Sequence, residues 1–144
     1  YQPEIVLLNA PSDRHPDHGR AHDLEKRACF LAGLPKIETV FDGLPQLPWR
    51  PKNMYAYIQD HYHEPSFVLD VSPYWNDRMK ALMAFSSQFY DPNSNDPQTP
   101  ISTPEFLNFI EGRAMQLGRL IHASKAEGLL ALKPLGVNSL LDLV

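Results

Sequence analysis

The residues best suited to chemistry lie together near the beginning of the chain. The run Asp13-Arg14-His15-Pro16-Asp17-His18 places two imidazoles and two carboxylates beside one another. Imidazole nitrogens and carboxylate oxygens serve as zinc ligands and as general acids or bases, so the run is compatible with a metal or catalytic centre. The same residues also suit a polar turn that leads into a helix. Spacing alone leaves both interpretations open.

Pro16 determines how the two histidines are presented. Proline favours the first position of a helix and keeps the preceding residue out of helical geometry, so we expect His15 to project from the loop and His18 from the first turn. The positive end of the helix dipole disfavours a charged imidazolium, which keeps His18 neutral and able to ligate zinc. Asp17 or Asp13 would accept the N–H of a histidine and fix its tautomer.

The other histidines give weaker signals. His22 lies one helical turn after His18, so the histidines at 15, 18 and 22 offer an alternative zinc site, although the helix pattern favours an exposed His22. His61 and His63 flank a tyrosine and are predicted to lie on a wet surface. His122 is expected to interact with the negative end of a helix.

Two more side chains require a choice between structure and function. Arg113 lies on an otherwise apolar helix face, where an ion pair with a carboxylate is favoured over an anion-binding role. Cys29 lies beside an apolar stripe, so we expect a small buried hydrophobe and not a nucleophile. It is the single cysteine, which excludes an internal disulfide.

Hydrophobic periodicity predicts the elements that position these residues. The apolar run 4–10 is typical of a strand buried on both faces, and the loop after it follows the carboxyl end of that strand, where α/β sheets collect ligands. We expect a helix from Pro16 to a stop at Gly33. Its predicted apolar face comprises Ala21, Leu24, Ala28 and Leu31.

The remaining pattern indicates an α/β fold with a mainly parallel sheet and an antiparallel addition. The proline-rich segment 35–52 is predicted to be a long surface excursion with at most a short strand. The other expected elements are strands at 54–58, 67–71 and 129–132, a helix capped by Ser72-Pro73 that extends to Phe89, a helix capped by Thr103-Pro104, and a small helix at 139–143.

Composition narrows the function classes. A chain of 144 residues that is 43% apolar and 21% charged predicts one globular domain. A net charge of −4, with both signs mixed along the chain, argues against a nucleic-acid partner. We find no signal peptide and no bilayer-spanning run, so we expect a cytoplasmic protein without a membrane partner. An apolar strand starts almost at once, which suggests that a preceding element has been removed.

Longer stretches carry a resemblance to a known family. Residues 2–8 followed by Asp13 to Gly19 resemble the PIG-L-like, or LmbE-type, zinc deacetylases, and within them the bacillithiol-pathway enzymes that deacetylate N-acetylglucosaminyl-malate. Stretches along nearly the whole chain look like that subfamily: Ala28–Leu34, Trp49–Lys52, Tyr57–Gln59, Phe67–Ser72, Gln88–Ser94 and Ala126–Gly128. One departure is Lys125-Ala126-Glu127-Gly128-Leu129, where relatives tend to have Tyr-Ala-Glu-Gly-Phe.

The resemblance implies a Rossmann-like three-layer fold and a set of roles. His18 would be a zinc (Zn²⁺) ligand, His15 would lie by the substrate carbonyl, Asp17 would orient a histidine, and we assign Arg14 to substrate binding. The family's other ligands and its general base belong to an Ala-His-Pro-Asp-Asp motif, which does not occur in this sequence. The chain is therefore expected to be the C-terminal part of one deacetylase domain.

The implied reaction is zinc-dependent hydrolysis of the acetamide of an N-acetylglucosaminide, and the chain alone is predicted to be inactive. An unpaired sheet edge would favour association with the N-terminal segment or a homo-oligomer. The alternative is a non-catalytic binding or assembly module that retains the fold.

Overall fold

The computed structural model describes residues 1–143, which form two compact units. The first unit comprises residues 1–67 and 128–143, and the second comprises residues 68–127. No helix in the described part of the chain is both long enough and apolar enough to span a bilayer.

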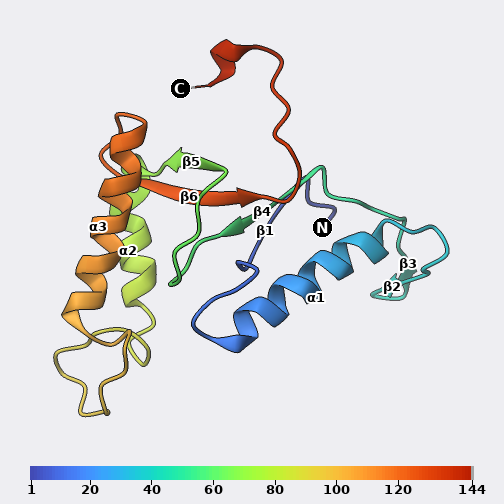
Figure 1. The fold of residues 1–144 in the computed structure, drawn as a ribbon. Helices are drawn as coiled ribbons and strands as arrows, with labels where there is room; N and C mark the ends of the chain where they lie inside the picture. Colours follow the sequence, from blue (N-terminus) through green and yellow to red (C-terminus); the bar gives the residue numbers. More distant parts are fainter. Residues whose placement is uncertain (144) are drawn as a thin grey trace. The chain divides into compact units, whose positions relative to one another are not determined.

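The first unit holds the residues that the sequence marks for chemistry. Strand β1 (Ile5–Leu8) leads through a loop into helix α1 (Pro16–Ala32), which runs beside β1 and ends at Gly33 as predicted (Figure 1). A small hairpin of β2 (Val40–Phe41) and β3 (Leu44–Pro45) follows near the C-terminal end of α1, and β4 (Asn53–Tyr57) comes next.

The hairpin confirms the predicted short strand within the surface excursion. Its turn consists of Asp42 and Gly43, which have φ angles of 49° and 77°. Left-handed geometry at both central residues is that of the two-residue hairpin turn, which Asp-Gly sequences favour.

The sheet contains parallel and antiparallel strands, which confirms the α/β class. Its strand order is β1-β4-β6-β5, where β5 is Phe67–Asp70 and β6 is Ala126–Ala131. β1 is parallel to β4 and β4 is antiparallel to β6. The parallel share is smaller among residues 1–143 than the sequence predicts, because β6 lies between β4 and β5 and runs against β4.

Burial along β1 alternates. Leu8 is fully buried, whereas Ile5 and Leu7 are 54% and 59% exposed. The prediction of burial on both faces is therefore wrong for the described residues. β1 is the edge strand of this sheet, and among residues 1–143 the side chains of Ile5 and Leu7 stay exposed while Leu8 is buried.

The buried side of α1 also differs from the prediction. Leu24, expected on the buried face, is 69% exposed, while His22 is 6% exposed. The backbone N–H of Asn9 donates to Glu25 Oε2 at 3.1 Å, and the Asn9 carbonyl accepts from His22 Nδ1 at 2.7 Å. Polar bonds to the end of β1 thus decide which face of α1 turns inward.

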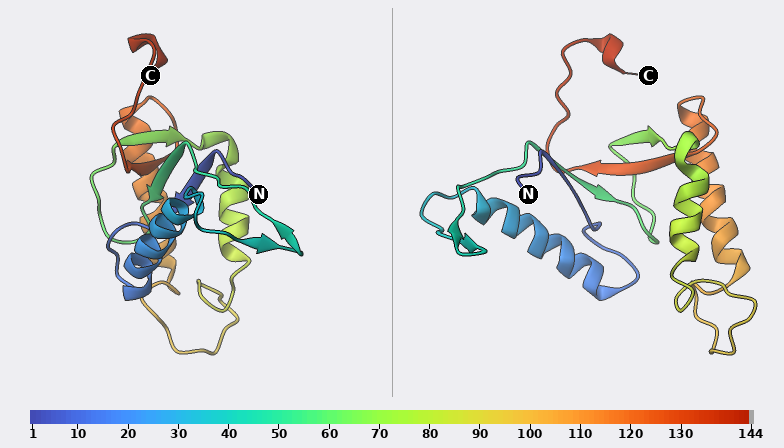
Figure 2. Two further views of the ribbon diagram at one scale, coloured as in Figure 1. Left: turned by 90° about the vertical axis from the view of Figure 1, so that its right-hand side faces the viewer. Right: turned by 180° about the vertical axis from the view of Figure 1, so that it is seen from behind.

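The second unit contains two helices that lie side by side (Figure 2). The short 3-10 helix η1 (Ser72–Tyr74) precedes α2 (Trp75–Met83), and α3 is Pro104–Leu120. Thr103 caps α3 as predicted, since its side chain accepts from the Phe106 N–H.

The predicted cap and end of the first of these helices are wrong. Ser72 Oγ accepts from the Lys125 N–H at 3.0 Å and donates to the Lys125 carbonyl, so it bonds to the residue before β6 and does not cap α2. The helix ends at Met83, and residues up to Phe89 form turns.

Toward the C-terminus, β6 is the last strand that the sequence predicts, and the 3-10 helix η2 (Leu140–Asp142) lies where a small helix is expected.

Candidate metal-ligand site at the start of helix α1

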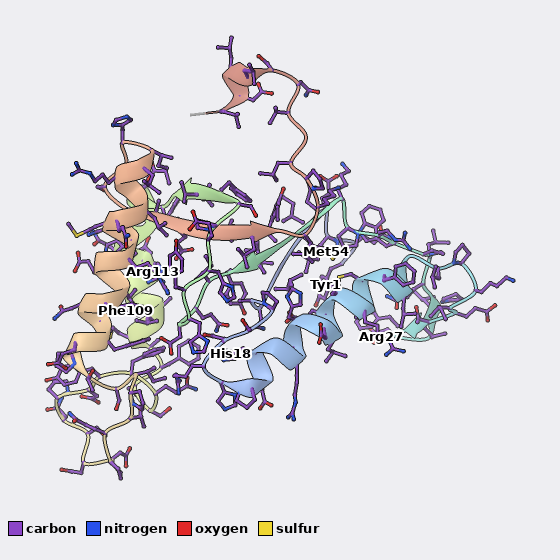
Figure 3. All side chains as sticks on the ribbon, viewed as in Figure 1. Tyr1, His18, Arg27, Met54, Phe109 and Arg113 are labelled. Atoms are coloured by element: carbon purple, nitrogen blue, oxygen red, sulfur yellow. The ribbon has the colours of Figure 1, made fainter. Side chains whose placement is uncertain are left out.

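The candidate site lies within the first unit, where the carboxyl end of β1 meets the N-terminus of α1. Figure 3 shows His18 at this end of α1. A Cβ atom on Gly19 would lie 3.0 Å from the Pro11 carbonyl oxygen, so glycine allows the first turn of α1 to approach the loop closely. Together with the Asn9 bonds to α1, this contact fixes the loop against the helix.

His15 is the N-cap residue of α1. Its Nδ1 accepts a hydrogen bond from the backbone N–H of Asp17 at 3.2 Å. An acceptor nitrogen of a neutral imidazole carries no proton, so the proton lies on Nε2. The side chain is 51% exposed, and His15 therefore presents a hydrogen-bond donor that a bound molecule can reach.

His18 has the opposite tautomer. Its Nδ1 lies 2.6 Å from Asp13 Oδ2. An ionised carboxylate only accepts, so His18 Nδ1 carries a proton, and in the neutral ring Nε2 keeps its lone pair. The two imidazole ring centroids are 5.6 Å apart, with the planes tilted by 37°. One ring thus offers a donor and the other a metal-binding lone pair within one small region.

Asp13 is the buried centre of the loop, with a side chain that is 1% exposed. Burial raises its pKa, but the hydrogen bonds from the His61 N–H, the His18 ring and the Arg14 N–H outweigh this, and the pKa is lowered to about 2. Asp13 is therefore ionised at neutral pH and remains an acceptor for His18.

The segment that follows β4 makes three polar contacts with the loop between β1 and α1. Arg14 Nε lies 2.8 Å from Asp60 Oδ2, the His61 N–H donates to Asp13 Oδ1 at 2.8 Å, and His63 Nε2 donates to the Ser12 carbonyl at 2.7 Å. The predicted wet-surface role is wrong for His63, which is half-buried and binds the loop, whereas His61 is exposed and contributes its backbone.

Sequence reasoning missed the contribution of the segment that follows β4. The signal that could have found it was the parallel pairing of neighbouring strands, because the loops that follow their carboxyl ends meet at one edge of the sheet. The β1–β4 pair brings the loops after Leu8 and Tyr57 together in this way.

Asp17 and Arg14 both have charged side chains beside them. The Asp17 carboxylate is 68% exposed, lies 3.8 Å from His15 Nδ1 and bonds to Arg20 at 3.3 Å. Of the two carboxylates considered from the sequence, Asp13 therefore makes the orienting bond, and Asp17 contributes its backbone N–H. The Arg14 guanidinium is held by Asp60, and its side chain is 39% exposed.

The alternative zinc site of three histidines does not form. His22 is buried, contrary to the predicted exposed position, and its Nδ1 bonds to the Asn9 carbonyl. Among residues 1–143, no group of three or more His, Cys, Asp or Glu side chains is arranged to hold a metal ion. The chemistry that these residues offer is one oriented imidazole ligand and one imidazole donor.

The other residues singled out from the sequence lie away from this loop. Cys29 is half-buried, and burial followed by the charge of Glu25 raises its pKa, which suits the inert role predicted. His122 follows the end of α3 in a left-handed conformation with φ 58°. The Arg113 guanidinium lies 5.1 Å from the centroid of the Phe109 ring, and both side chains project from α3 (Figure 3).

A second polar cluster, Trp75 with Arg78 and Lys125, lies in the second unit. The Trp75 ring lies 4.9 Å from the Arg78 guanidinium and 5.3 Å from the Lys125 ammonium. Arg78 bonds to Glu127, and Lys125 lies 2.7 Å from Glu111. Each cation in this Trp75 cluster thus has both an aromatic face and a carboxylate.

Comparison with solved structures finds proteins that share this fold. No protein-family model matches the sequence. The conserved protein TT1542 from Thermus thermophilus aligns with a TM-score of 0.78 at 25% identity. The 4-carboxy-2-hydroxymuconate hydratase GalB from Pseudomonas putida gives 0.67 at 19%, and the N,N'-diacetylchitobiose deacetylase from Pyrococcus horikoshii gives 0.68 at 21%.

These alignments cover most of this chain and about half of each neighbour. They include 96%, 96% and 91% of this chain, against 56%, 56% and 46% of the TT1542, GalB and deacetylase chains. The shared fold has therefore supported both a deacetylase and a hydratase, and the reaction must be argued from the site residues.

Proposed function

We propose that this chain is part of a zinc-dependent deacetylase of the PIG-L-like, or LmbE-type, family that hydrolyses the acetamide of an N-acetylglucosaminide. The observation that carries the proposal is the opposite bonding of the two imidazole Nδ1 atoms at the start of α1, where His15 Nδ1 accepts from a backbone N–H and His18 Nδ1 faces the Asp13 carboxylate. His18 offers an Nε2 lone pair held in place by Asp13, and His15 offers an Nε2–H donor with its ring centroid 5.6 Å from that of His18. In zinc-dependent amide hydrolysis the metal acts as a Lewis acid, and a hydrogen-bond donor stabilises the developing oxyanion.

The donor chemistry of the loop fits one position of a zinc site. Zinc ligands are commonly neutral imidazoles whose other N–H is held by a carboxylate, and His18 with Asp13 has this arrangement. A bound zinc ion would supply a Lewis acid that polarises the acetyl carbonyl and activates water.

His15 is assigned the role of oxyanion donor. Because Nδ1 accepts from the helix, His15 is neutral in this arrangement and donates only through Nε2. Donation of that proton to a leaving amine would create an imidazolate, whereas a hydrogen bond to an oxyanion requires no proton transfer. The oxyanion role therefore fits the observed cap better than the general-acid role.

The remaining zinc ligands and the general base are proposed to come from polypeptide outside residues 1–144, in an Ala-His-Pro-Asp-Asp motif. β1 is an edge strand of the described sheet, and Ile5 and Leu7 are exposed on it. An added parallel strand would satisfy the free backbone groups of β1, and further polypeptide packed on the face of the sheet would cover these side chains. Association with that segment, or within a homo-oligomer, follows as part of the proposal.

The substrate class rests on the resemblance of the sequence to the bacillithiol-pathway enzymes, which implies N-acetylglucosaminyl-malate. The test is release of acetate from this compound by the full-length protein, before and after zinc is removed with a chelator and restored. We expect activity that depends on zinc, and no turnover by the 144-residue chain alone. Turnover by the isolated chain, or zinc-independent turnover by the full protein, would contradict the proposal.

One observation favours a non-catalytic binding or assembly module as the second candidate. Residues 1–143 contain no group of three metal-binding side chains. The two candidates differ in the parent reading frame: an Ala-His-Pro-Asp-Asp segment upstream supports the enzyme, and its absence together with no acetate release supports the module.

A further inference from the structure

The Asp13 carboxylate has three hydrogen-bond partners, and its two oxygens bond to different groups. Oδ1 accepts from the backbone N–H groups of Arg14 at 2.9 Å and of His61 at 2.8 Å. Oδ2 lies 2.6 Å from His18 Nδ1. The carboxylate therefore joins the loop after β4 to the first turn of α1.

We propose that Asp13 is a positioning residue that sets the tautomer of His18 and thereby decides whether His18 can bind a metal. This inference deepens the zinc-deacetylase proposal and rests on it for the metal, but the tautomer itself is independent of that function. Imidazole free in water prefers the Nε2–H form. The 2.6 Å contact between His18 Nδ1 and the Asp13 carboxylate favours the other form, whose Nε2 lone pair is the metal-binding one.

The two oxygens of Asp13 predict an unusual effect of an isosteric substitution. In Asp13→Asn, the two backbone N–H groups require the amide oxygen at the Oδ1 position, because the amide nitrogen cannot accept from them. The NH2 group then faces His18 Nδ1, which must become an acceptor. The proton moves to Nε2, and the nitrogen that would face a metal loses its lone pair.

The primary experiment is two-bond 1H–15N NMR of the histidine rings in the full-length, zinc-free protein at about pH 8.5, well above the ordinary histidine pKa of about 6.5. We expect His18 as the Nδ1–H tautomer and His15 as the Nε2–H tautomer. Asp13→Asn should convert His18 to Nε2–H. The matched control is Asp23→Asn on the exposed side of α1, which should leave both rings unchanged.

The wild-type spectrum decides the inference even if Asp13→Asn fails to fold. An Nε2–H tautomer of His18 in the wild type would overturn it, as would a folded Asp13→Asn protein whose His18 tautomer stays Nδ1–H. Zinc affinity, measured against a fluorescent chelator, separates this result from the proposed function. We expect a fall of roughly 10- to 100-fold in Asp13→Asn and no fall in Asp23→Asn. Predicted tautomers in a protein that binds no zinc would support the positioning role and contradict the deacetylase proposal.

Discussion

The loop at the start of α1 and the Trp75 cluster are both dense polar networks, but they differ in what they leave available. In the Trp75 cluster, Arg78 and Lys125 each have a carboxylate and an aromatic face. In the loop, one nitrogen of each ring of His15 and His18 is fixed, and among residues 1–143 neither Nε2 atom has a hydrogen-bond partner. The Trp75 cluster, whose charged groups satisfy one another, is therefore suited to a structural role, whereas the loop, which orients imidazole nitrogens that have no partner among residues 1–143, is suited to binding.

The largest expected effect is that of His18→Ala. Removal of the ligand nitrogen should abolish zinc-dependent acetate release and lower zinc affinity beyond the roughly 100-fold loss that removal of an orienting partner causes. Zinc content after dialysis and the acetate assay measure both effects. Retention of stoichiometric zinc by this variant would show that the loop is not a ligand site.

Substitution of His15 separates its chemical role from its cap role. Asparagine is a good N-cap residue, so His15→Asn should keep the unfolding temperature while kcat falls on the order of 10²- to 10³-fold, as for loss of an oxyanion donor. His15→Ala should lose about 0.5–2 kcal/mol of stability as well. Equal kcat values for wild type and His15→Asn would remove His15 from the mechanism.

The pH dependence of stability should identify Asp13. Its pKa of about 2 in the folded protein lies below the ordinary value of 3.8, so its ionised form stabilises the folded state. The contribution, about 2 kcal/mol by linkage, is fully present above about pH 4 and is lost as the pH falls toward 2. Urea unfolding of wild type and Asp13→Asn over this range should show a stability difference that shrinks with acid. A constant difference would mean that the Asp13 pKa is not lowered by folding.

The smallest expected effect is in the Trp75 cluster. Lys125→Met should remove the ion pair with Glu111 and the contact with Trp75, and should lower stability by about 0.5–1.5 kcal/mol. Since each charged group of this cluster has its partner within the cluster, the kcat and the zinc affinity of Lys125→Met should match those of the wild type. A change in either value would mean that the cluster is more than a structural contact.

The sequence predicted the elements more successfully than their burial. Pro16 and Gly33 marked both ends of α1, and Thr103 marked the start of α3, because caps act locally. The inward face of α1 was not predictable from periodicity, since the bonds of His22 and Glu25 to Asn9 outweigh the apolar stripe.

The candidate site was predicted in part for the same reason. The two histidines are neighbours in sequence, whereas Asp60, His61 and His63 reach the loop only through the pairing of β1 with β4. Asp13 and Asp17 were equivalent candidates for the orienting carboxylate from their types and spacing. The closeness of the loop after β4, which also donates to Asp13, distinguishes them in the folded chain.

Titration of zinc into full-length protein carrying 15N-labelled histidine tests the central claim most directly. We predict that His18 Nε2 changes its chemical shift strongly and in proportion to bound zinc, while Nδ1 keeps its proton and its bond to Asp13. An active, zinc-loaded enzyme in which the His18 Nε2 resonance stays where it was without metal would contradict the assignment of His18 as a ligand.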